Sequence, residues 1–148
     1  MIVTFCGHAN ATFTADETQA LRDAIFTILH RYPHSLFYLG DYGSFDRLCN
    51  QILREQQRSF PMLRRIFITP YLDPDYAHLQ NANQYDEVLY PFESAIHPRY
   101  AIAKRNLWMV DHADLVIGYI RYDWGGAAKM REYALRKHKP FINLADLS

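Results

Sequence analysis

The chain has 148 residues, 49% of them hydrophobic and 22% charged, which fits one folded domain over residues 1–148. Sixteen basic residues balance sixteen acidic ones, so net charge does not favour nucleic acid, and no nucleic-acid partner is expected. No apolar run approaches the ~20 residues of a membrane span, and the first residues lack the basic start of a signal peptide, so we expect a cytoplasmic protein without a membrane partner.

Short apolar runs alternate with amphipathic helices along the sequence. In chain order the pattern predicts a strand at 2–6, a helix at 14–32, a strand at 35–40, a helix around 45–53, a strand at 64–72, a loop at 73–86, a short strand at 87–91, a helix at 98–112, a strand at 115–120, a helix after paired glycines, and a closing apolar run at 141–144. Nearly all-apolar strands between helices are typical of a parallel sheet covered on both faces. We therefore expect a single three-layer α/β domain with a mainly parallel sheet of about five strands.

In a parallel sheet of this kind, ligands bind in the crevice beyond the carboxyl ends of the strands. Residues that follow the predicted strands, or begin the next helix, are therefore the candidate ligand-binding residues. They are Gly7, His8, Gly40, Gly43, Ser44, Asp46, Trp124, Gly125, Gly126, Ala127, Ala128 and Lys129. Helix N-termini at that edge present unpaired backbone N–H groups and a partial positive charge, which favours a nucleotide phosphate or a phosphosugar as the ligand.

Several of these residues have an equally simple structural explanation. Gly125 and Gly126 fit a tight turn from strand to helix, although the alanines that follow favour close approach of a ligand. Asp46 can cap its helix or accept a hydrogen bond from a ribose hydroxyl. His8 lies where acid–base chemistry near neutral pH is feasible, but no carboxylate is paired with it in the sequence. The histidines show no metal-binding spacing and no cofactor motif occurs, so we expect neither a metal nor a cofactor.

Four segments occur in order along the chain: "CGH" after the first predicted strand, "LGDYGSFD" after the second, "KRNLWMVDHAD" on a helix and "WGGAAKMREYA" at the start of the next. Together they resemble the YpsA-like branch of the SLOG superfamily, a Rossmann-like group that includes the LOG enzymes and the DNA-processing protein DprA. The resemblance extends from residue 2 to about residue 144. It implies a single Rossmann-like domain that binds a nucleotide.

The LOG enzymes are phosphoribohydrolases, which split a nucleoside 5′-monophosphate into the free base and ribose 5-phosphate. The resemblance implies catalytic roles for Glu132 and Arg105, which have the spacing of the family's glutamate and arginine. A carboxylate near the anomeric carbon stabilises an oxocarbenium-like transition state, and a guanidinium suits a phosphate or orients the carboxylate. The structural alternatives are a solvated or helix-stabilising Glu132, and an Arg105 that is a surface charge or part of a buried ion pair. Trp124, Ala128 and Lys129 depart from the family motif, which has proline, glycine and threonine there.

Two functions therefore stay open. The first is a sensor that binds a nucleotide or a nucleotide derivative, such as an ADP-ribose-like ligand, without turnover. The second is an enzyme that breaks an N-glycosidic bond, either a phosphoribohydrolase or a deoxyribosyltransferase. The apolar run Leu107–Val110 covers much of one helix, which favours a homodimer or a higher homo-oligomer, and the resemblance implies the same.

Overall fold

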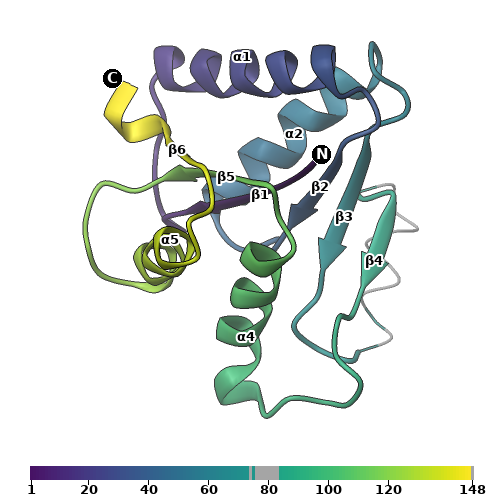
Figure 1. Cartoon of the computed structure of the whole chain (residues 1–148), viewed down its shortest axis with the longest axis vertical. Helices are drawn as coiled ribbons and strands as arrows, with labels where there is room; N and C mark the ends of the chain where they lie inside the picture. Colours follow the sequence, from purple (N-terminus) through teal and green to yellow (C-terminus); the bar gives the residue numbers. More distant parts are fainter. Residues whose placement is uncertain (74, 76–83, 148) are drawn as a thin grey trace.

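The computed structural model describes residues 1–73, 75 and 84–147 of the chain. Within these residues, strands alternate with helices as the sequence predicts (Figure 1). The strands are β1 (Ile2–Gly7), β2 (Leu36–Leu39), β3 (Arg64–Ile68), β4 (Glu87–Leu89), β5 (Leu115–Tyr119) and β6 (Phe141–Asn143). The helices are α1 (Ala15–Arg31), α2 (Ser44–Gln57), α4 (Pro98–Asp111) and α5 (Gly126–Arg136), followed by the short 3-10 helix η2 (Leu144–Leu147).

The described strands form one sheet in the order β4-β3-β2-β1-β5-β6, and every neighbouring pair is parallel. The predicted α/β fold with a mainly parallel sheet is confirmed. The sheet has six strands rather than about five, because the closing apolar run pairs with β5 as a three-residue strand, with Ile142 beside Ile117. Most of the predicted loop at 73–86 falls outside the described residues.

Helices cover both faces of the sheet, so the domain has three layers (Figure 1). Alternate residues of β1 supply the two sides: Val3 and Phe5 pack with α1 and α2, whereas Cys6 packs with α4 and α5. The predicted capping box begins α1, where the Thr14 hydroxyl accepts from the Glu17 backbone N–H at 3.1 Å and the Glu17 carboxylate accepts in return. No helix among the described residues is both long and apolar enough to cross a bilayer.

The chain reverses its direction of winding at β1. Strands β2, β3 and β4 follow one another on one side of β1, and β5 and β6 lie on the other side. The loops that leave β1 and β5 therefore diverge at the carboxyl edge of the sheet and leave a crevice between them. This position is where the sequence analysis expects the ligand site.

Candidate functional site

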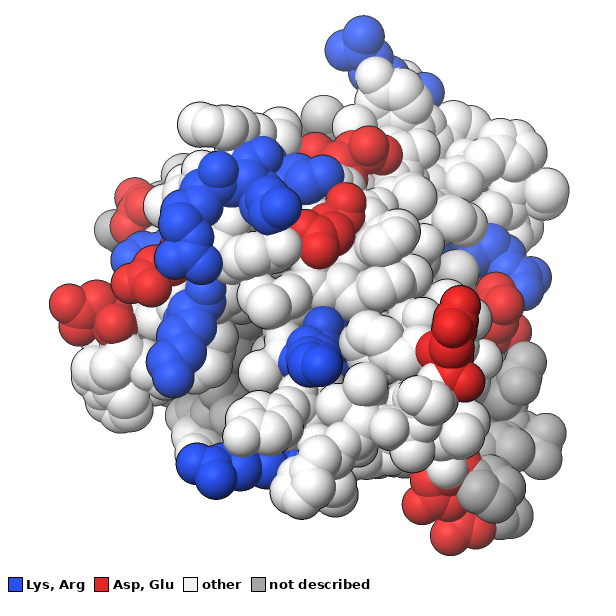
Figure 2. Space-filling model, turned by 60° about the horizontal axis from the view of Figure 1, so that its bottom comes forward, with Lys and Arg blue, Asp and Glu red and all other residues white. Residues whose placement is uncertain are grey.

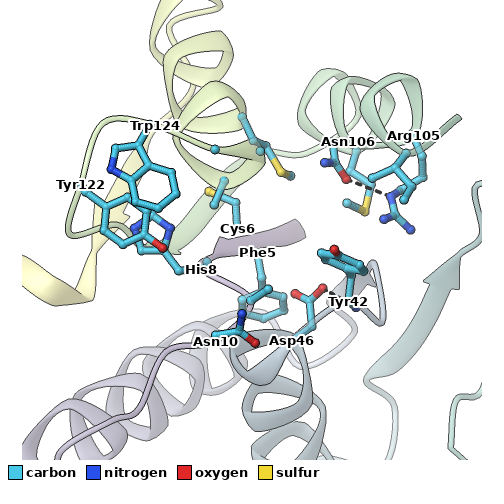
Figure 3. Close-up of a pocket in the computed structure, with 18 residues that line it drawn as sticks. Phe5, Cys6, His8, Asn10, Tyr42, Asp46, Arg105, Asn106, Tyr122 and Trp124 are labelled. Atoms are coloured by element: carbon cyan, nitrogen blue, oxygen red, sulfur yellow. Dashed lines mark hydrogen bonds between the residues drawn. The ribbon is translucent and has the colours of Figure 1, made fainter. Parts of the chain in front are cut away.

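A cavity of about 340 Å³ lies at the carboxyl end of β1, where the strand order reverses. Figure 3 shows its walls, which are the end of β1 and the loop after it, the first turn of α2, one side of α4, and the segment that leads from β5 into α5. The parallel sheet brings these distant segments of the sequence together. The cavity therefore occupies the place where doubly wound sheets bind their ligands.

Most of the predicted site residues line this cavity. They are Gly7, His8, Asp46, Arg105, Trp124, Gly125, Gly126 and Ala127. They come from three different strand ends and from α4, so the position of a residue relative to a strand end was sufficient to find most of them.

The remaining predicted residues do not line the cavity. They are Gly40, Gly43, Ser44, Ala128, Lys129 and Glu132. Gly40 lies behind the wall, where an added Cβ would be 3.1 Å from the guanidinium carbon of Arg105 and 3.2 Å from a carboxylate oxygen of Asp46. Ala128 packs in the core, and the two charged residues of this set are exposed on α5. A catalytic contact by Glu132 accordingly stays a prediction.

Arg105 is the buried cation of the cavity wall, with 2% of its surface exposed. Its Nη1 donates hydrogen bonds to the carbonyl oxygens of Gly40 at 3.0 Å and Ile68 at 2.8 Å, at the ends of β2 and β3. Its Nε donates to Oδ1 of Asn106 at 2.9 Å. These bonds hold the guanidinium in one orientation, so a bound phosphate would not have to order it.

Asp46 is the carboxylate of the cavity and lies in the first turn of α2, with its side chain directed toward the cavity (Figure 3). Its Oδ2 accepts a hydrogen bond from the Tyr42 backbone N–H at 3.0 Å, which ties the loop before α2 to the first turn of the helix. Burial raises the pKa of Asp46 from 3.8 to about 6, although the Tyr42 hydrogen bond and the charge of Arg105 act to lower it. A carboxyl group with this pKa can give or take a proton near neutral pH.

Three stacked aromatic rings form the other side of the cavity (Figure 3). The His8 ring lies on the Tyr122 ring with centroids 3.5 Å apart, and Tyr122 lies on Trp124 with centroids 4.2 Å apart. Nε2 of His8 accepts a hydrogen bond from the Arg121 backbone N–H at 3.0 Å, so the neutral ring carries its proton on Nδ1. Burial and the nearby charge of Arg131 lower the pKa of His8, which favours this neutral form.

The N-termini of α5 and α2 differ in what covers them. Neither helix has a side-chain cap, and the N-cap residues Gly125 and Gly43 both have a φ of +91°. An added Cβ at Gly125 or Gly126 would meet no atom within 4 Å. At Gly43, an added Cβ would lie 2.4 Å from the Cα of Ala9, whose carbonyl oxygen accepts from the Ser44 N–H at 2.7 Å. The start of α5 is open toward the cavity, whereas the protein's own chain covers the start of α2.

The cavity lining also includes residues that were not among the predicted site residues, such as Asn10, Tyr42, Asn106 and Met130. Asn10 and Tyr42 each come three residues after a strand ends, so the strand-end rule covers them. Asn106 and Met130 lie on helices, whose orientation about their axes the strand-end rule does not address. Cys6 also lines the cavity, but burial raises the pKa of its thiol, so it stays protonated and is a poor nucleophile.

Charges of both signs are present on the face of the molecule in Figure 2, with one row of Lys and Arg side chains along its left side. This view therefore shows a local row of basic groups rather than a face of a single charge. Among the residues that the structure describes, no group of His, Cys, Asp and Glu side chains could hold a metal ion.

Solved structures with the same fold include DNA processing protein A (DprA) from two bacteria. The structure of the Helicobacter pylori protein was used to describe how that protein binds single-stranded DNA. It aligns with a TM-score of 0.65 at 18% identity, over 95% of this chain and 63% of that one. The Streptococcus pneumoniae protein aligns with a TM-score of 0.59 at 12% identity over 94% of this chain and 48% of that one. The chain thus spans less than two thirds of either DprA chain.

A third similar structure is the structural-genomics target TM1055, with a TM-score of 0.58 at 15% identity over 99% of this chain and 78% of that one. No protein-family model matches the sequence, and no curated protein matches it. At identities of 12–18%, the three alignments show a shared fold. They confirm the Rossmann-like domain that the sequence resemblance to the SLOG superfamily implies.

Proposed function

We propose that the protein binds a nucleotide, or a related phosphosugar, in the cavity at the end of β1. The observation that carries this proposal is that the buried guanidinium of Arg105 and the open N-terminus of α5 line the same cavity. Both groups attract an anion: a guanidinium through charge-assisted hydrogen bonds, and a helix N-terminus through its free N–H groups and dipole, worth up to ~2 kcal/mol.

The other polar side chains of the cavity suit a sugar. Asp46, Asn10 and Asn106 line it together with the cation, and their oxygen atoms can accept hydrogen bonds from sugar hydroxyls. A cavity that offers Arg105 to a phosphate and Asp46 to hydroxyl groups matches a phosphorylated sugar better than an apolar ligand. The proposal therefore names the phosphosugar as the part of the ligand that the cavity holds.

A thermal-shift screen, followed by calorimetry, tests this function. Nucleoside 5′-monophosphates and ADP-ribose should stabilise the protein, by about 4 kcal/mol at a thousandfold excess over the dissociation constant, and the matching nucleosides should not. Equal responses to nucleosides and nucleotides would contradict a phosphate site. A single-stranded oligonucleotide belongs in the panel because the Helicobacter pylori protein binds single-stranded DNA. Saturable oligonucleotide binding without any response to mononucleotides would overturn the proposal.

A second candidate function is hydrolysis of the N-glycosidic bond of a nucleoside 5′-monophosphate. It is favoured by Asp46, a carboxyl group with a pKa of about 6 that lines the cavity with Arg105. In this reaction water adds to the anomeric carbon and the base leaves with a proton, while a carboxylate stabilises the positive charge on the sugar. The resemblance assigns this carboxylate role to Glu132. We propose Asp46 for it instead, because Glu132 is exposed and outside the cavity lining.

Two variants made side by side test this second function. Wild type, Asp46→Asn and Glu132→Gln are incubated with a panel of nucleoside monophosphates, and free base is measured by chromatography. Loss of the acting carboxylate should reduce turnover by roughly 10²–10⁴-fold, and we expect this loss in Asp46→Asn alone. If only Glu132→Gln loses turnover, Glu132 and not Asp46 is the carboxylate that stabilises the sugar. If the wild type releases no base, the hydrolysis proposal fails and the binding proposal stands.

We also propose that the protein forms a homodimer, through α4. The apolar run that motivated this expectation is partly used inside the domain, because Met109 and Val110 are buried. Leu107 remains 37% exposed and Tyr100, on the same helix, 53% exposed. Sedimentation at micromolar concentration should give a dimer, and Leu107→Ser should shift it toward the monomer. A wild-type monomer would remove this proposal without affecting the cavity.

A further inference from the structure

The aromatic stack at the cavity is a rigid group with one open end. His8, at the inner end, is 5% exposed and is fixed by the hydrogen bond from the Arg121 backbone. The planes of His8 and Tyr122 differ by 9°, and those of Tyr122 and Trp124 by 24°. Trp124, at the outer end, is 67% exposed although its ring stacks on Tyr122. The stack therefore presents an indole to solvent at the rim of the cavity (Figure 3).

An exposed indole needs an explanation, because the removal of a tryptophan side chain from water is favourable and lowers the free energy. The stacked rings of His8 and Tyr122 hold the Trp124 ring in place, so a planar ligand would not have to order this ring on binding. Aromatic side chains held in this way are the usual stacking partners of nucleic-acid bases. The exposed ring is thus suited to a planar heterocycle.

The size of the cavity agrees with a ligand that extends out of it. A volume of about 340 Å³ is near the low end of the range for small-molecule sites. Its polar groups, Arg105 and Asp46, lie on the side away from the aromatic stack (Figure 3). A phosphosugar bound by these groups would leave its third part, the base, at the rim beside Trp124.

We propose that Trp124 is the base-stacking residue of the site and that the ligand carries a purine base. This inference rests on the proposed nucleotide binding and narrows it, since a sugar phosphate without a base would use only the inner cavity. A purine covers more of the indole than a pyrimidine does, so purine nucleotides should bind more tightly than pyrimidine nucleotides. Trp124 then contributes affinity for the base and none for the phosphosugar.

The experiment uses the fluorescence of Trp124 and two probes, adenosine 5′-monophosphate and ribose 5-phosphate. The chain has two tryptophans, and Trp108, which packs on Tyr38 and His112 away from the cavity lining, is replaced by Phe to leave Trp124 as the reporter. Adenosine monophosphate should quench the Trp124 emission. Ribose 5-phosphate should leave the emission unchanged but compete with the nucleotide for the cavity.

Variants at Trp124 separate stacking from general weakening of the site. Trp124→Ala should bind adenosine monophosphate roughly 5- to 150-fold more weakly than wild type, which is the usual range for loss of one base stack, with unchanged affinity for ribose 5-phosphate. Trp124→Phe should recover most of the loss, because it keeps a ring. Met62→Ala is the matched control, since Met62 is 55% exposed and precedes β3 at the opposite edge of the sheet.

The outcomes distinguish the two proposals. If adenosine monophosphate binds Trp124→Ala as tightly as wild type, the stacking inference is overturned while nucleotide binding stands. If cytidine monophosphate binds wild type as tightly as adenosine monophosphate does, the purine preference is overturned. If neither adenosine monophosphate nor ribose 5-phosphate binds wild type, the proposed function fails and the inference fails with it.

Discussion

The N-termini of α2 and α5 have the same backbone conformation but different surroundings. Each follows a strand at the carboxyl edge, and each uses a glycine with φ of +91° and an extended ψ as its N-cap, without a side-chain cap. At α2 the space above Gly43 is filled by Ala9, whose carbonyl accepts from the first helical N–H. At α5 the space above Gly125 is empty.

This difference between the two N-termini shows two separate reasons why a glycine can be required at a position. At Gly43 both the backbone conformation and the close approach of another segment require it, so the residue is explained without a ligand. At Gly125 only the conformation requires it, and Gly126 has neither a positive φ nor a neighbour within 4 Å of an added Cβ. Empty space above two successive glycines is what a ligand lying against the backbone would need.

The largest expected effect is on stability, in the pair Gly43→Ala and Gly125→Ala. Both variants force an alanine into a backbone region that is nearly exclusive to glycine, at a cost of about 1–3 kcal/mol each. Gly43→Ala adds a clash with the backbone of Ala9, so we expect a total of about 3–5 kcal/mol at that position. Urea unfolding measures both. Equal losses would show that the covered and the open junction do not differ as described.

An effect of intermediate size is expected from Asp46→Asn at the covered junction. Burial raises the pKa of Asp46 from 3.8 to about 6, so the folded protein binds this proton more tightly than the unfolded chain does. The stability that the group contributes is present below pH 4 and is lost as the pH rises through 6. Asparagine should therefore stabilise the protein by up to about 3 kcal/mol at pH 8 and by little at pH 4.

Denaturant unfolding of wild type and Asp46→Asn at the two pH values checks this prediction. The exposed Asp123, on the loop before α5, supplies the matched control: Asp123→Asn also removes one carboxylate but should not show a stabilisation that appears only at high pH. A destabilised Asp46→Asn at pH 8 would mean that the carboxylate stabilises the cavity wall in its charged form, against the pKa of about 6.

The smallest effect on stability is expected from Gly126→Ala at the open junction. Gly126 is the first residue of α5 and an added methyl group meets no protein atom, so stability should rise by about 0.4–1 kcal/mol. Nucleotide binding should nevertheless weaken, because the methyl group enters the space proposed for the phosphosugar. Calorimetry on the folded variant measures this. If the affinity is unchanged, the ligand does not lie against Gly126, and the open space at the N-terminus of α5 is not a ligand site.

Much of the fold could be predicted because most strands are short apolar runs that alternate with helical patterns. The one strand left uncounted was β6: its apolar run was noted, but its pairing with β5 does not follow from a sequence pattern. The position of the cavity also followed from the sequence, since it depends on strand ends alone. The positions of the strand ends are enough to identify His8, Asp46 and Trp124 as cavity residues.

The orientation of each helix about its axis cannot be read from the positions of strand ends. Met130 faces the cavity, and a residue two positions later on a helix lies roughly 200° around the axis, so Glu132 is exposed on the other side. The contact of Glu132 with a ligand, which the family motif implies, stays a prediction. The same information about helix orientation would have identified Asn106, one residue after Arg105, as a cavity residue.

Arg105 has a consequence for folding kinetics as well as for the site. Its guanidinium joins the end of β2, the end of β3 and α4, through partners 65 and 37 residues away in the sequence. These bonds require that the two strands have paired and that α4 has docked, so we expect them to form after the main folding barrier. An interaction absent from the transition state slows unfolding and leaves the folding rate nearly unchanged. We therefore expect a substitution of Arg105 to speed unfolding while the folding rate stays nearly unchanged.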